Sequence, residues 1–313
     1  MISVLGGGVA GLCAATALAE RGLAVEVIES EEAPAPVSLL AGGMLAPFCE
    51  GEAAPAQVVQ MGLSAADWWE AHGAKVHRRG TLVVAPARDA AELDRFARLT
   101  RGHEWVDPGA LEPDLAGRFA RGLFFRVEAH MDPCAALAAL RRQLAARGVR
   151  FHAGPARGRI VDCTGWAAAA HLPDLRPVRG EMLMLRAPEV TLSRTVRLLH
   201  PRFPCYIVPR GDGQYMIGAT MVESARPGPV TARAVMELLS AAWTVHPAFA
   251  EAEVTATGAG LRPAFPDNIP AIRRAGERIH VNGMYRHGFL CAPHLAEALA
   301  GELVEELAPC ASN

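Results

Sequence analysis

Three glycines near the start of the chain, Gly6, Gly8 and Gly11, have the spacing of a phosphate-binding turn. Gly6 permits a tight turn, Gly8 lets the backbone approach a pyrophosphate, and Gly11 lets a helix pack close to the preceding strand. The first amides of that helix and the positive end of its dipole both favour an anion. The pattern therefore predicts that the chain binds a dinucleotide.

An acidic residue, Glu29, lies 18 residues beyond Gly11. An acid at the end of the second strand accepts hydrogen bonds from the ribose hydroxyls and disfavours the extra phosphate of NADP. The glycines alone would be a weak signal, but an acid at this distance and two flanking strands make the motif specific. These residues do not decide between FAD and NAD.

The elements that must position this motif follow from the apolar pattern. Residues 2–5 form a short apolar run typical of a buried strand, and residues 9–21 have apolar side chains at helical spacing. Residues 23–29 alternate into a second strand. A strand-helix-strand unit is therefore predicted at the N-terminus.

The rest of the chain mixes both kinds of element. Helices are predicted over 132–148, 231–245 and 294–309, and a β-hairpin is predicted over 206–221. Residues 258–274 are rich in glycine and proline, and we expect them to form loops.

Composition excludes several classes of protein. The 313 residues carry a net charge of −2, with no basic patch for nucleic acid. No apolar run approaches the roughly 20 residues that a membrane span needs, and the N-terminus does not have the pattern of a signal peptide. Seven scattered cysteines without a C-x-x-C pair predict reduced thiols. We therefore expect a cytoplasmic protein without a metal site, a membrane partner or a nucleic-acid partner.

Four further stretches, taken with the opening motif, resemble one family. They are LAGGMLAP, YIVPRGDGQYMIGATM, AGLRPAFPDNIPAI and YRHGFLCAP. Their order and spacing are similar to those of the glycine oxidases of thiamine biosynthesis, a branch of the FAD-dependent D-amino-acid oxidase superfamily. The resemblance covers nearly the whole chain and implies that the dinucleotide is FAD.

The resemblance also implies roles for individual residues. Those expected to bind the cofactor are Gly6, Gly8, Gly11, Glu29, Ser30, Ser38, Ala41, Gly42, Gly43, Met44, Gly165, Arg286, His287, Gly288, Phe289 and Leu290. Those expected at the catalytic site are Arg262, Tyr206, Arg286, Met221 and Met44. Among these, Arg262 would bind the substrate carboxylate, with Tyr206 beside it. From residue type alone, Arg262 could instead pair with a surface acid, and Tyr206 could be a core residue.

The chain departs from the family pattern in three places. Only PARG separates HAG from RIVD, which implies a lost β-meander and leaves the adenine contacts around residues 153–159 undefined. The loop SLLAGG replaces a more alanine-rich sequence. The cysteine motif that links flavin covalently in related sarcosine oxidases is absent around GLRPAFPDNIP, so FAD is expected to be non-covalent.

The predicted fold is α/β, with a discontinuous Rossmann-type FAD-binding domain (1–75, 126–175 and 258–313) and an α+β substrate domain on a mixed or antiparallel sheet (76–125 and 176–257). The resemblance implies oxidation of glycine or another small amino acid, with dioxygen reduced to hydrogen peroxide. Two alternatives stay open: a D-amino-acid or sarcosine dehydrogenase or oxidase that uses another electron acceptor, and a non-catalytic flavin-binding subunit. Whether the chain forms a homo-oligomer is also left open.

Overall fold

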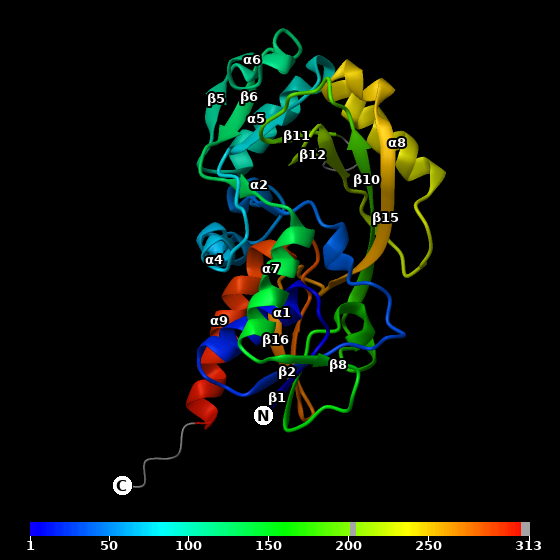
Figure 1. The fold of residues 1–313 in the computed structure, drawn as a ribbon. Coiled ribbons are helices and arrows are strands. Elements are labelled where there is room, and N and C mark those ends of the chain that lie inside the picture. The colour runs from blue at the N-terminus through cyan, green and yellow to red at the C-terminus, as the bar shows by residue number, and fades with distance from the viewer. Residues whose placement is uncertain (201–204, 308–313) are drawn as a thin grey trace.

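Two β-sheets, one in each half of the molecule, organise the chain (Figure 1). The computed structural model describes residues 1–200 and 205–307. The two long strands β10 and β15 lie side by side and extend from the upper half in Figure 1 toward the lower one. The predicted α/β fold class is therefore confirmed, with one mainly parallel sheet and one mainly antiparallel sheet.

The first sheet contains the predicted strand-helix-strand unit. Its strands, in spatial order, are β16 (Ala271–Ala275), β17 (Arg278–Asn282), β9 (Arg159–Asp162), β1 (Ile2–Leu5), β2 (Val25–Ile28) and β8 (Arg150–His152). The strands from β17 to β8 run parallel, and β16 pairs antiparallel to β17. The predicted short link between RFHAG and RIVD is present, since β9 follows β8 with no strand between them.

Helices cover this sheet and bury its apolar side chains. The α-helices of the described chain are α1 (Val9–Glu20), α2 (Pro47–Glu50), α3 (Ala56–Gly62), α4 (Ala65–Ala71), α5 (Ala90–Leu99), α6 (Pro108–Leu111), α7 (Pro133–Ala146), α8 (Ala232–Val245) and α9 (Gly288–Leu307). Helices α1, α7 and α9 lie together against the first sheet (Figure 1) and share one apolar core. Among the described residues, no helix is both long enough and apolar enough to cross a membrane.

The second sheet is larger and mixed. Its strands, in order, are β14 (Val222–Glu223), β10 (Arg176–Arg186), β13 (Gln214–Gly218), β12 (Cys205–Gly211), β11 (Thr195–Leu198), β4 (Thr81–Val84), β6 (Gly122–Phe125) and β5 (Glu104–Val106), and β15 (Glu253–Ala264) also pairs with β10. The pair β3 (Met44–Leu45) and β7 (Ala129–His130) forms a separate ribbon. The predicted hairpin corresponds to β12 and β13, which pair antiparallel.

Residues 253–264 correct one expectation from the sequence. The region from 258 was expected to be loops, but it continues β15, which pairs with β10 as far as Ala264. The glycines that suggested a loop instead leave space for side chains of a neighbouring segment that pack against β15. A Cβ atom at Gly260 would lie 2.5 Å from a methyl group of Val37. The division into two domains stays a prediction, and its boundary at 257/258 falls inside this strand.

Helix α9 begins earlier than predicted, at Gly288 rather than at His294. Pro293 lies inside the helix, where a proline leaves the carbonyl four residues earlier without its usual amide donor. That carbonyl belongs to Phe289, and it accepts a hydrogen bond of 2.8 Å from the indole Nε1 of buried Trp69. The indole therefore replaces the missing donor, and the helix continues through the proline.

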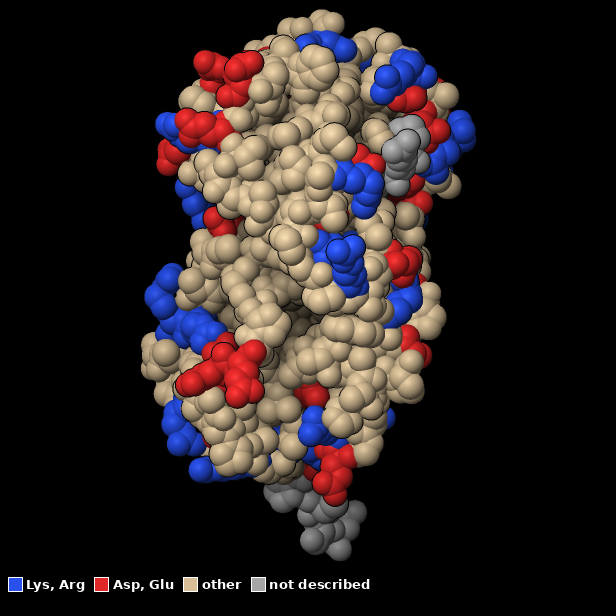
Figure 2. All heavy atoms as spheres, turned by 90° about the vertical axis from the view of Figure 1, so that its right-hand side faces the viewer, with Lys and Arg blue, Asp and Glu red and all other residues tan. Residues whose placement is uncertain are grey.

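One face of the molecule is hollowed between the two halves (Figure 2). It is the face that lies to the right in Figure 1, and uncharged side chains make up most of its middle.

Candidate functional site

The glycine-rich turn has the geometry that a pyrophosphate needs. Gly6 has a φ of +95°, and a Cβ atom at Gly11 would lie 1.8 Å from the carbonyl oxygen of Gly6. Gly8 precedes α1 and provides no capping side chain, and the first turn of α1 contains no acid. The Val9 amide donates to Ser38 Oγ over 3.0 Å, so the predicted residue Ser38 lies at this turn.

Glu29 follows β2 and lies beside the same turn. Its carboxylate forms an ion pair with Arg141 of α7, with Arg141 Nη1 2.8 Å from Oε2 and Nη2 bonded to Oε1. A Cβ atom at Gly7 would lie 1.7 Å from Glu29 Oε1, so the acid is folded against the turn. Each carboxylate oxygen has more than one lone pair, so both can still accept a hydroxyl. Ser30 is exposed, and its Oγ accepts from the amide of Glu32.

The loop before β3 is fixed by a half-buried arginine. Arg210 of β12 donates to the carbonyl oxygens of Ala41 and Gly42, the latter over 2.9 Å, and to that of Met131. Gly43 has a φ of +67°, and a Cβ atom there would lie 2.1 Å from the Met131 carbonyl oxygen. The predicted flavin loop is therefore held between two other segments, and only glycine fits at 43.

A pocket of about 970 Å³, including its open part, collects most of the predicted site residues. Of the predicted residues, those in its wall are Ser38, Ala41, Gly42, Gly43, Met44, Tyr206, Arg262, Arg286, His287, Gly288, Phe289 and Leu290. Gly6, Gly8, Gly11, Glu29, Ser30, Gly165 and Met221 do not line it. The turn that would hold phosphate is continuous with this pocket through Val9 and Ser38.

Two of the residues outside the wall have clear local roles. The carbonyl oxygen of Gly165 accepts a hydrogen bond of 2.9 Å from Asn282 at the end of β17. Met221 Sδ accepts from the hydroxyl of Tyr285 over 3.4 Å and contacts Arg286 Nη1 at 3.6 Å. Met221 therefore supports side chains that line the pocket without lining it itself.

Arg262 lies on β15 rather than on the loop that the sequence suggested. Its Nη1 donates to the carbonyl oxygen of Thr220 over 3.0 Å, and a Cβ atom at Gly180 would lie 2.3 Å from its Cζ. Within the described residues, no acidic side chain forms an ion pair with Arg262. Burial lowers the pKa of the guanidinium, an effect that Tyr206 partly opposes, but an arginine keeps its charge at neutral pH. A cation without an acidic partner therefore faces the pocket.

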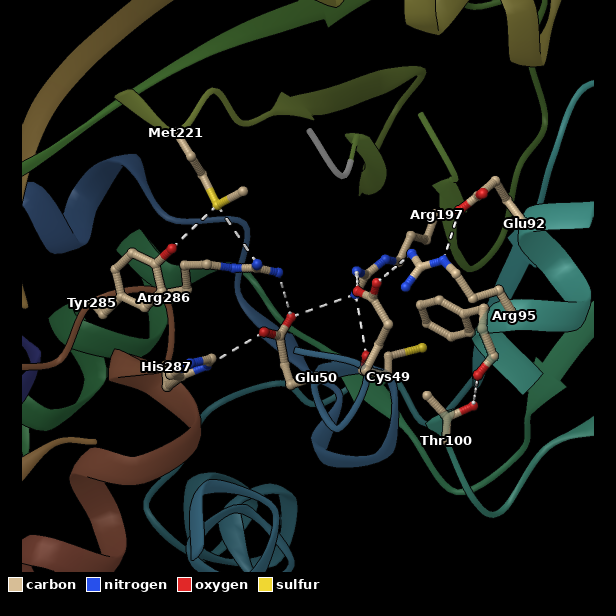
Figure 3. Close-up of polar contacts among 12 residues, drawn as sticks. Cys49, Glu50, Glu92, Arg95, Thr100, Arg197, Met221, Tyr285, Arg286 and His287 are labelled. Carbon is tan, nitrogen blue, oxygen red and sulfur yellow. Dashed lines mark hydrogen bonds and ion pairs between the residues drawn. The ribbon is translucent and has the colours of Figure 1, made fainter. Parts of the chain in front are cut away.

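Arg286, by contrast, already has an acidic partner (Figure 3). Its Nη2 lies 3.0 Å from Oε1 of Glu50, and both side chains are mostly buried. His287 Nδ1 is 3.4 Å from the other oxygen of Glu50, and burial lowers the pKa of His287 to about 4. Burial alone would raise the pKa of Glu50, but Arg286, His287 and Arg197 together lower it. Sequence reasoning missed Glu50, and no motif in the sequence marks it.

A second buried carboxyl, Glu128, holds the short helix that carries Glu50. Ala46 precedes α2 and cannot cap it, and Glu128 Oε1 instead accepts from the amide of Cys49 over 2.7 Å. Burial raises the pKa of Glu128 to about 7. At pH values between its ordinary pKa and about 7, this group is protonated in the folded chain and ionised in the unfolded one.

Glu128 is therefore expected to make stability pH-dependent. Below its ordinary pKa the protonated group contributes about 3 kcal/mol to the free energy of unfolding. This contribution is lost as the pH rises through about 7. Glu128→Gln keeps the acceptor oxygen and removes the titration. The free energy of unfolding is measured in urea for the variant and the parent at about pH 4.5 and about pH 8. The difference, variant minus parent, should be about 3 kcal/mol larger at pH 8 than at pH 4.5. A difference that does not change with pH would contradict the protonated state of Glu128.

Comparisons with known proteins agree with this geometry. The family model "DAO: FAD dependent oxidoreductase" matches residues 1–302. A protein of Rhizobium etli named as a thiamine biosynthesis oxidoreductase, ThiO, is 55% identical, with 97% of each chain covered. The glycine oxidase of Geobacillus kaustophilus is 27% identical, with 97% of this chain and 92% of that protein covered. Its crystal structure superposes with a TM-score of 0.82 at 25% identity, over 99% of this chain and 95% of that one.

Proposed function

Because the chain belongs to the family of FAD dependent oxidoreductases, we propose that it oxidises the amine of a small amino acid, with glycine as its first substrate. FAD is the cofactor of this family. The observation that carries the proposal is the guanidinium of Arg262, which faces the pocket without an acidic partner in the described chain. A planar fork of donors suits a carboxylate.

The described residues fit FAD at both of its ends. The turn at Gly6, Gly8 and Gly11 and the start of α1 would hold the pyrophosphate, and Glu29 would accept the ribose hydroxyls. The loop from Ala41 to Met44 and the residues from Arg286 to Leu290 would lie along the flavin, where both segments line the pocket. No cysteine of the described chain lines the pocket, which supports non-covalent binding.

The chain's own residues bind, orient and desolvate the substrate. Arg262 would hold the carboxylate, and Tyr206, which lines the same pocket, would flank it. Met44, Met182 and Met216 make part of the wall apolar, which excludes water and strengthens the pairing of opposite charges. When bound, FAD supplies the two-electron acceptor for the oxidation. Glycine thereby loses two hydrogens and becomes an imine, and dioxygen gains them as hydrogen peroxide.

The relatives support the place of this reaction in metabolism. The protein of Rhizobium etli is named for thiamine biosynthesis, and the Geobacillus protein is named a glycine oxidase. We propose that the imine formed from glycine is delivered to the thiazole branch of thiamine synthesis. Scattered cysteines and the absence of a membrane-crossing helix in the described chain support a cytoplasmic location.

The proposed oxidase is tested by its products. Purified protein with glycine in air should form one hydrogen peroxide for each glycine consumed, and acid precipitation should release FAD intact into the supernatant. A protein whose flavin is reduced by glycine, but which consumes glycine in air only when an artificial electron acceptor is added and forms little peroxide, would be a dehydrogenase. A flavin that no amino acid reduces without oxygen would indicate a non-catalytic subunit.

Removal of the acid at the glycine turn should weaken FAD binding. Glu29→Ala deletes the acceptor for the ribose hydroxyls, and a hydrogen bond to a charged group contributes about 1.5–3 kcal/mol, so FAD should dissociate roughly 10- to 100-fold more readily. The dissociation constant is measured by titrating apoprotein and following flavin fluorescence. Glu31→Ala, at an exposed position two residues away, is the matched control. Equal affinity in the Glu29 variant and the parent would remove Glu29 from the cofactor site.

A further inference from the structure

The two arginines of the pocket differ in their charge balance. Arg286 is paired with Glu50 at 3.0 Å, whereas Arg262 donates to the carbonyl oxygen of Thr220 and has no acidic partner among the described residues. Both guanidinium groups line the same pocket, and the positive charge of Arg286 lowers the pKa of Arg262. Two cations thus face one space, and one of them is neutralised by the protein itself.

Glu50 is held in place by a chain of alternating charges that leads away from the pocket (Figure 3). Arg197, which is 1% exposed, lies 3.7 Å from Glu50 and 3.1 Å from Glu52. Arg95 in turn forms ion pairs with both Glu52 and Glu92, each at 2.8 Å. With Arg286, this row of charged side chains contains three arginines and three glutamates, so the row is neutral as a whole. The other acid in the pocket wall, Glu181, is paired with Arg179.

From this charge balance we infer that Glu50 determines specificity: by neutralising Arg286, it restricts the pocket to amines that carry one carboxylate and excludes those that carry a second. The inference rests on the proposed function and names the substrate class of the same site. A second carboxylate near Arg286 would meet the negative charge of Glu50, and like charges brought together in a buried site oppose binding. With Glu50 neutral, Arg286 would become a second anion-binding group.

Glu50→Gln tests this inference because glutamine keeps the size of the side chain and one acceptor oxygen. The probes are diglycolate, which has two carboxylates and no oxidisable amine, and its monoamide, which has the same shape and one charge fewer. Binding to the FAD-loaded protein is followed through the change in flavin absorbance. The ratio of affinities, diglycolate over monoamide, should rise about tenfold or more in the variant. Iminodiacetate and its monoamide should show the same change in kcat/KM.

Two further variants make the result specific to the charge on Arg286. Glu52→Gln removes a carboxylate of the same charge chain that does not contact Arg286, and it should leave the ratio within about twofold of the parent. In the double variant Glu50→Gln/Arg286→Met the gain for diglycolate should disappear. Melting temperature and FAD content confirm that each variant is folded.

Several results would overturn the inference. These are a parent protein that already prefers diglycolate, an equal gain for both probes in the Glu50 variant, and a gain that persists without Arg286. Since diglycolate binding needs no turnover, this experiment stands even if glycine fails to reduce the flavin. That second failure would refute the proposed function alone.

Discussion

Replacement of Arg262 by methionine is expected to lower kcat/KM for glycine by about 100-fold or more while FAD stays bound. The variant keeps an unbranched apolar stem, so the packing of β15 on β10 should change little. A hydrogen bond to a charged group contributes about 1.5–3 kcal/mol, and misplacement of the reacting carbon adds to the loss. The measurement is steady-state peroxide formation at several glycine concentrations, together with the flavin content of the purified variant.

Two controls distinguish an Arg262 that binds the substrate carboxylate from an Arg262 that only supports the fold. Arg186→Met removes an arginine of β10 whose ion pair with Glu253 of β15 is solvent-exposed, and such pairs contribute only about 0–1 kcal/mol. Its glycine turnover should match that of the parent. Methylamine lacks a carboxylate, so its slow turnover should be nearly the same in the Arg262 variant and the parent. An equal loss on glycine and methylamine would assign Arg262 a structural role.

Gly11→Ala should remove FAD binding and destabilise the fold. A Cβ atom at this position would lie 1.8 Å from the backbone oxygen of Gly6, and neither the strand nor the helix can move without opening the core around α1. Overpacking of this kind costs about 1–3 kcal/mol or more, and here the displaced turn is the one that would hold the pyrophosphate. Flavin content after purification and the melting temperature are the measurements.

Gly301→Ala is the matched control for that variant. Gly301 also lies inside a helix, α9, but a Cβ atom there would have no neighbour within 4 Å. Alanine is the better helix former by about 1 kcal/mol, so this variant should be as stable as the parent or more stable, and it should retain FAD. If Gly11→Ala were equally well tolerated, close packing of α1 on β1 would not be what holds the turn in shape.

The local parts of the fold could be predicted because their signals lie within a few residues. The turn at Gly6 and the helix after it follow from glycine spacing and apolar periodicity, and the hairpin of β12 and β13 follows from its turn residues. The extension of β15 to Ala264 could not be predicted, because its partner β10 lies about 80 residues earlier in the sequence. Pairing with β10 holds this segment as a strand although its glycines and its proline locally favour a loop. The same holds for α9, where the donor that compensates for Pro293 comes from Trp69.

The candidate site shows the same division. Most of the residues that the family resemblance implied line one pocket, but the partners that set their charge state were not predicted. Glu50 and Arg286 are far apart in the sequence, and only the tertiary structure brings them to 3.0 Å. Arg141, which pairs with Glu29, was missed for the same reason, since a basic residue on a helix has no sequence signal for a partner on another element.

The most direct test of the carboxylate-anchored oxidation is reduction of the bound flavin without oxygen. The FAD-loaded protein is mixed anaerobically with glycine or with methylamine, and the loss of the oxidised flavin absorbance is followed in a stopped-flow instrument. Glycine is expected to reduce the flavin completely, and about 100-fold or more faster than methylamine at equal concentration, because only glycine has a carboxylate for Arg262. Equal rates for the two amines, or a flavin that glycine leaves oxidised, would contradict this mechanism.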